Sequence, residues 1–140
     1  ANEIPHQKSI THFAAIVNCG CPEAYHNNIA IAQCAEFART VGFAWMGALS
    51  LGGGVGIVHA VPLEELDGRV TAIKRSLELA AQELTESKAI SEEAKKLMAK
   101  PIIPSWMYHL VGSYGWKKEA KKFGTQKQLN ARPYEIAEYH

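Results

Sequence analysis

Two short apolar runs that flank one helical segment limit the possible folds of this chain most strongly. Residues 11–18 (THFAAIVN) and 43–51 (FAWMGALSL) are apolar without alternating with polar residues, which predicts strands buried on both faces. Residues 29–40 predict a helix, ended by Gly42 in a left-handed conformation. A strand, a helix and a strand in so short a segment predict a right-handed crossover with parallel strands, and hence an α/β fold.

The rest of the chain predicts helices rather than strands. A long helix is expected from Pro62 to about Ser87, because its apolar residues recur with a period of 3.6. A shorter helix is expected at 92–99, with Ser91 as its N-cap. A basic helix is expected at 117–123, and residues 132–139 predict a short helical turn. The chain therefore has about two strands and four to five helices.

So few strands do not make a complete sheet, because two parallel strands leave both outer edges unpaired. We expect a partial doubly wound parallel sheet, with a βαβ core and glycine-rich loops at 1–61. A helix-rich C-terminal part of the same domain is expected at 62–140. The chain begins with Ala1 rather than Met, so a preceding segment is the first candidate for the missing strands. A partner chain and an additional strand at 56–61 are the alternatives.

The loop after the first strand is the leading candidate for a binding site. It contains six consecutive residues, Cys19, Gly20, Cys21, Pro22, Glu23 and Ala24. Ligands of open α/β sheets bind beyond the carboxyl ends of the strands, and Gly20 with Pro22 predicts a tight turn whose N–H groups face a flat ligand or an anion. A helix start capped by Asn27 or Asn28 adds the positive end of a dipole. In the simpler alternative, Gly20 and Pro22 only turn the chain.

A second glycine-rich run, residues 52–56 (GGGVG), follows the second strand and suggests a phosphate-binding loop. The run lacks the Lys-Ser/Thr pair of a nucleotide P-loop, and no helix start follows at once to supply a dipole. The alternative is a strand exit where the backbone passes close to a neighbouring segment.

Three cysteines and His26 raise the question of a metal or thiol site. Cys19 and Cys21 have a C-x-C spacing rather than the usual C-x2-C, and Cys34 lies on the apolar face of the predicted helix. We therefore expect small apolar side chains and free thiols in a reducing cytoplasm, without a metal. No Ser, His and Asp order typical of a catalytic triad is apparent in the sequence.

Several sequence patterns between residues 10 and 125 are familiar from one protein family. They are Val17-Asn18-Cys19-Gly20-Cys21-Pro22-Glu23, Phe37-Ala38-Arg39, Gly42-Phe43-x-Trp45-x-Gly47, Leu51-Gly52-Gly53-Gly54 and Gly115-Trp116-x3-Ala120-Lys121-Lys122-x-Gly124. In these patterns the chain resembles the C-terminal half of flavodoxin-like NAD(P)H-dependent FMN reductases.

The resemblance implies a five-stranded parallel sheet in which residues 11–18 would be the fourth strand and 43–51 the fifth. Residues 19–24 would then match the loop that touches the isoalloxazine ring of FMN. The family's first three strands and its Ser/Thr-rich phosphate loop have no counterpart here. Hydride transfer from a nicotinamide to flavin would therefore belong to a longer parent protein. We expect this chain alone to bind FMN weakly or not at all.

An aromatic segment, residues 106–116 (WMYHLVGSYGW), precedes the basic helix. It could pack over its own sheet, dock on a partner subunit, cover a flavin, or lie on a membrane surface with the following lysines at its edge. A net charge of +1 and a pI of about 7.9 give no reason to expect nucleic acid. No apolar run is long enough to cross a bilayer, so we expect no membrane partner.

Two functional hypotheses follow from these features. In the first, the chain is the C-terminal portion of a flavin-dependent NAD(P)H oxidoreductase and supplies sheet strands, a dimer surface and one wall of the flavin site. In the second, it is a non-catalytic interaction module that uses the aromatic C-terminal helices. Because the sheet has an unpaired edge, we also expect a homo-oligomer.

Overall fold

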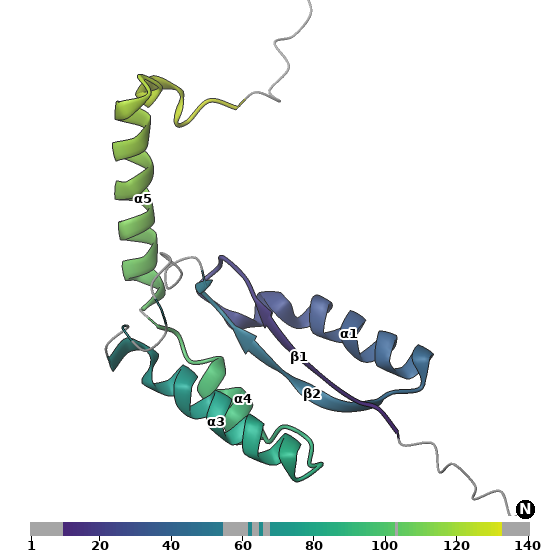
Figure 1. Ribbon diagram of the computed structural model, residues 1–140. Helices are drawn as coiled ribbons and strands as arrows, with labels where there is room; N and C mark the ends of the chain where they lie inside the picture. Colours follow the sequence, from purple (N-terminus) through teal and green to yellow (C-terminus); the bar gives the residue numbers. More distant parts are fainter. Residues whose placement is uncertain (1–9, 55–61, 63–64, 66–67, 103, 133–140) are drawn as a thin grey trace, which may run out of the picture. The chain divides into compact units, whose positions relative to one another are not determined.

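The computed structural model describes residues 10–54, 62, 65, 68–102 and 104–132. The helices and strands within these residues, in chain order (Figure 1), are β1 (His12–Asn18), α1 (Asn28–Val41), β2 (Ala44–Leu51), α3 (Thr71–Thr85), α4 (Glu92–Met98) and α5 (Ser105–Lys122). The short 3-10 turns are η1 (Ala24–Asn27), η3 (Gly68–Val70) and η4 (Gln126–Gln128). The predicted fold class, a partial doubly wound α/β sheet with a helix-rich C-terminal part, is confirmed.

β1 and β2 pair in parallel, with Asn18 opposite Leu51 at their carboxyl ends. The register shifts near the other end, because Phe13 lies opposite Trp45 whereas Ala14 lies opposite Gly47. Residue 46 is thus an extra residue on β2. Gly47 next to it has a φ of 103°, a conformation that favours glycine over residues with a side chain.

Helix α1 covers one face of the sheet through aromatic contacts. The rings of Phe13 on β1 and Phe37 on α1 lie 5.6 Å apart in an edge-on arrangement. Ala38 is fully buried. The helix ends as predicted at Gly42, which has a φ of 77°, and the N–H of Phe43 donates to the carbonyl of Ala38.

The opposite face is covered by the main core cluster, to which β2, α3 and α4 all contribute. Its buried members are Leu49, Val70, Ile73, Ala80, Ile90, Ala94 and Met98. Ala14 of β1 is partly buried against this cluster, whereas its neighbour Phe13 faces α1. Successive side chains of a strand point to opposite faces, so helices lie on both sides of the two strands, as a doubly wound sheet requires.

The two strands differ in burial, which corrects the expectation that both are buried on both faces. Three residues of β2 are at most 7% exposed, namely Met46, Ala48 and Leu49. No residue of β1 is buried, and Ile16 is 65% exposed. On its outer side β2 accepts a hydrogen bond from the N–H of Ile90 to the carbonyl of Met46, at 2.7 Å. Among the described residues, the open edge of the sheet therefore belongs to β1.

The helices that follow β2 match the predictions where the structure describes them, namely in α3 and at the start of α4. The long helix appears as α3, preceded by η3, and its predicted start near Pro62 lies largely outside the described residues. Ser91 caps α4 as predicted, since its hydroxyl accepts from the N–H of Ala94. The additional strand at 56–61 lies outside the described residues, and so does nearly all of the helical turn at 132–139.

The chain separates into two compact units, one up to residue 103 and one from residue 104 onward. Of the two residues at the predicted boundary, residue 61 lies outside the described residues and residue 62 is described. In the second unit the aromatic segment and the basic helix, expected as separate pieces, form the single continuous helix α5. No helix among the described residues is long and apolar enough to cross a membrane.

Candidate functional site

The six predicted site residues form the loop between β1 and η1, at the carboxyl end of the sheet. Gly20 and Cys21 are exposed at its tip, whereas Pro22 and Ala24 are buried. The other two, Cys19 and Glu23, are half-buried. The loop is therefore anchored on its C-terminal side and presents its tip to solvent.

Backbone hydrogen bonds tie this loop to the glycines that follow β2. The N–H of Cys19 donates to the carbonyl of Leu51 at 3.1 Å. In the other direction, Gly53 donates to the carbonyl of Cys21 at 2.6 Å and Gly54 donates to that of Cys19 at 3.0 Å. Pairing of the two segments thus continues beyond the ends of β1 and β2, which lie side by side in Figure 1. The structure brings together the two glycine-rich segments that the sequence placed at this edge.

Glycine at position 52 is required by the close approach of the two segments. A Cβ atom on Gly52 would lie 2.3 Å from the carbonyl oxygen of Pro22 and 2.8 Å from the backbone nitrogen of Ala24. A Cβ on Gly54 would lie 3.2 Å from the side-chain oxygen of Asn18. These contacts favour the strand-exit interpretation of this run over a phosphate-binding loop, because its first glycines contact the protein itself.

The side chain of Asn27 connects the ends of both strands next to the candidate loop, a role that the sequence alone did not reveal. Asn27 occupies the N-cap position of α1, one of the two positions predicted for the cap, but its side chain makes no capping hydrogen bond. Instead the side-chain amide lies within hydrogen-bonding distance of the carbonyls of Val17 (3.2 Å) and Leu51 (3.0 Å) and of the Ser50 hydroxyl (3.1 Å). Asn27 is 3% exposed, so these bonds are made in a dry environment where an unpaired amide would be costly.

Ser50 extends this network to the candidate loop. Its hydroxyl donates to the carbonyl of Ala24 at 2.7 Å, and its oxygen accepts from Asn27. The ends of both strands and the start of α1 are consequently joined through two side chains. The only sequence signal for this arrangement was an asparagine between a loop and a helix, which is equally typical of a helix cap.

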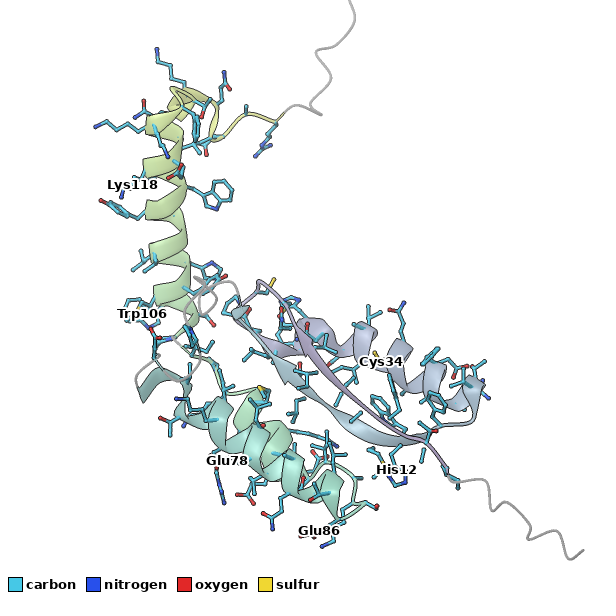
Figure 2. All side chains as sticks on the ribbon, in the orientation of Figure 1. His12, Cys34, Glu78, Glu86, Trp106 and Lys118 are labelled. Atoms are coloured by element: carbon cyan, nitrogen blue, oxygen red, sulfur yellow. The ribbon has the colours of Figure 1, made fainter. Side chains whose placement is uncertain are left out.

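The cysteines do not gather into a metal site in the described part of the chain. The thiol of Cys19 lies near the carbonyl oxygens of Cys21 and Glu23, at 3.4 and 3.8 Å. Cys34 lies on α1 (Figure 2) and is half-buried. All three thiols are free. No group of three His, Cys, Asp or Glu side chains suited to a metal is found among the described residues.

An aromatic pair borders the site at the start of η1. The rings of Tyr25 and His26 are 4.3 Å apart, and His26 lies 3.8 Å from a carboxylate oxygen of Glu23. Tyr25 is 63% exposed. A flat ligand at this edge would find an aromatic face beside a backbone turn, an arrangement suited to stacking.

Comparisons with known proteins give no match. No family model, no curated protein and no solved structure is similar to this chain at a significant level.

Proposed function

We propose that this chain is the C-terminal portion of an FMN-dependent NAD(P)H oxidoreductase, in which it supplies two sheet strands, a dimer surface and one wall of the flavin site. One observation carries the proposal. The loops after β1 and β2 are tied together at the carboxyl edge of a parallel sheet, the edge where doubly wound proteins bind their ligands.

The loop has the properties that the wall of a flat-ring site needs. Its exposed tip, Gly20 and Cys21, carries only small side chains, so a planar ring could approach the backbone closely. The buried Pro22 and Ala24, with the Asn27 network beneath them, hold the tip in place. When bound, flavin supplies the hydride chemistry, and the role of these residues is to position the ring and to exclude water.

FMN titration of this chain alone tests whether the phosphate-binding part of the flavin site lies outside this chain. Because most of the affinity for FMN is assigned to a phosphate loop outside this chain, flavin fluorescence should change only at high concentrations of protein. A low-micromolar dissociation constant for this chain would contradict the assignment of the phosphate site to another segment.

A charge-introducing variant tests the wall itself in a longer gene product that includes the preceding coding sequence. Cys21→Glu places a carboxylate at the exposed loop tip and should weaken flavin binding by about tenfold, equivalent to about 1.4 kcal/mol. Gln33→Glu adds the same charge on the exposed face of α1 and is the matched control. Equal affinity of the two variants for flavin would refute the position of the wall.

The exposed face of α5 favours a second candidate, a non-catalytic interaction module. Trp106, Leu110 and Tyr114 follow one another at intervals of four residues and are 63, 63 and 72% exposed. The coding sequence upstream of Ala1 separates the candidates. A strand followed by a Ser/Thr-rich turn favours the flavoprotein, whereas an unrelated domain favours the interaction module.

A further inference from the structure

A groove of about 350 Å³ lies at the carboxyl end of α5, in the second compact unit. Its lining residues are Trp116, Glu119, Ala120, Phe123, Thr125 and Leu129. Ala120 is 7% exposed and forms the best-buried part of the lining. The groove is separate from the candidate site at the sheet and was not predicted from the sequence.

The turn after α5 builds the groove. Gly124 has a φ of 69°, and the N–H of Thr125 returns to the carbonyl of Ala120 at 2.8 Å, which closes the helix with a left-handed residue. The η4 turn that follows brings Leu129 back beside the helix. The groove is thus a product of local hydrogen bonds, and it does not depend on the other unit.

The lining is apolar and largely uncovered by the described residues. Trp116 is 73% exposed, Phe123 is 70% exposed and Leu129 is 43% exposed. Burying such side chains is favourable by about 25 cal/mol for each Å² of apolar surface. An occupant with apolar side chains would therefore be stabilised there.

The last turns of α5, which carry the groove, add a second requirement, which is negative charge. Four exposed lysines occupy the last turns of α5, namely Lys117, Lys118, Lys121 and Lys122. Glu119 is the single acidic residue of α5, and it lies 3.8 Å from Lys122. Figure 2 shows Lys118 near this end of the helix and Trp106 near the other end. An occupant with both apolar and acidic side chains fits these surroundings.

We propose that residues 133–140 of the same chain (PYEIAEYH) dock in this groove. Tyr134 and Ile136 are the apolar residues that enter it, and Glu135, on the other side of the extended segment, is the acid that faces the lysines. In an extended peptide, residues two apart point to the same side, so Tyr134 and Ile136 reach the groove together.

The connection between Leu129 and residues 133–140 is also long enough for these residues to reach the groove. Tyr134 lies five residues beyond Leu129, which itself lines the groove. At roughly 3.5 Å for each extended residue, five residues span about 17 Å. An intramolecular return over so short a connection is entropically favoured over capture of a separate molecule.

Cleavage of the full chain by a Glu-specific protease at Glu135 and Glu138 tests the proposal. Docking protects these sites, and cleavage follows the population of the undocked form. In a Tyr134→Ala/Ile136→Ala variant the rate of cleavage should rise roughly fivefold. Lys117→Glu/Lys121→Glu should raise it similarly, whereas Lys95→Glu/Lys96→Glu on α4 serves as the matched control and should not change it.

A second measurement reports on the groove itself rather than on residues 133–140. The indole N–H signal of Trp116, assigned with a Trp116→Phe variant, should shift in the Tyr134→Ala/Ile136→Ala variant while circular dichroism stays unchanged. Equal cleavage of all variants with an unshifted indole signal would overturn the proposal. Protection that depends on protein concentration, with a dimer in sedimentation, would also overturn it, because a second copy would then supply the segment.

Discussion

Asn27 shows how a single residue can serve tertiary structure where its sequence position suggests a local role. Its amide lies close to the carbonyls at the ends of both strands and to Ser50, residues that are 10 to 24 positions away. A helix-cap role would have used a neighbouring backbone N–H instead. The buried amide thereby fixes the spacing of the two strand ends beneath the candidate loop.

We expect Asn27→Ala to lower the free energy of unfolding by about 1–3 kcal/mol, because it removes the buried amide and leaves its acceptors without that donor. Urea denaturation measures the change. Asn28→Ala, at the exposed neighbouring position, is the control and should change the free energy of unfolding by less than about 1 kcal/mol. Similar losses for both variants would show that the buried amide has no special role.

Gly52→Ala is predicted to disturb the same site through backbone overlap. A Cβ atom 2.3 Å from the Pro22 carbonyl forces one of the two loops to move, and we expect a loss of roughly 1–3 kcal/mol in unfolding free energy. Gly68→Ala, where a Cβ meets nothing within 4 Å, is the matched control. Amide shifts at residues 19–24 in NMR spectra report the movement, and their absence in Gly52→Ala would contradict the overlap.

At the scale of elements, the start of α4 depends on a residue of α3. The Ser91 hydroxyl accepts from the N–H of Ala94, while the backbone N–H of Ser91 donates to the carboxylate of Glu83 at 2.9 Å. In a capping box the backbone N–H of the N-cap residue instead donates to the side chain of an acid three residues after the cap. Here α3 supplies the carboxylate, so the cap also joins two helices.

This cap predicts a pH-dependent stability. Hydrogen bonds from the Ser91 side chain and then from its backbone hold the pKa of Glu83 below its ordinary value. A carboxyl with a lowered pKa in the folded state contributes stability above its unfolded pKa of about 4.3, and loses it as the pH falls through the folded value. Glu83→Gln should therefore flatten the loss of thermal stability below this pH.

The control for this prediction is Glu78→Gln, which removes an exposed carboxylate of the same helix (Figure 2) that lies 3.5 Å from Arg75. Melting temperatures measured across the acidic range compare the two variants. An identical pH profile for Glu83→Gln and the unchanged protein would disprove a contribution of the cap to acid stability.

At the scale of the whole molecule, the described residues cover part of the outer side of β2 and leave the outer side of β1 open. The Ile90 bond to Met46 covers part of the outer side of β2, whereas β1 carries the strongly exposed Ile16. An uncovered strand edge offers unpaired N–H and C=O groups to another strand. The open side is the one on which the proposed parent protein would place its remaining strands.

We therefore expect this chain, when isolated, to self-associate through β1. Ile16→Lys puts a charge beside the open edge and should reduce the associated fraction measured by light scattering. Ile29→Lys, at a position of α1 that is 76% exposed, is the control and should leave association unchanged. A monomer at all concentrations would contradict an open edge at β1.

The sequence alone determined β1, α1, β2 and α4 with most of their ends, whereas it predicted α5 as two separate pieces. Non-alternating apolar runs identified β1 and β2, a left-handed glycine at Gly42 ended α1, and Ser91 started α4. These features are governed by forces within a few residues, namely backbone conformation, periodic burial and capping bonds, so they can be predicted from neighbours in the chain.

Only the tertiary structure decided which edge of the sheet is open, where the Asn27 amide points, and why Gly52 must lack a side chain. Each of these depends on atoms brought together from distant parts of the chain, such as Pro22 beside Gly52 and Glu83 beside Ser91. The physical reason is that steric overlap and buried hydrogen bonds act over a few ångströms in space, and sequence spacing does not record that distance.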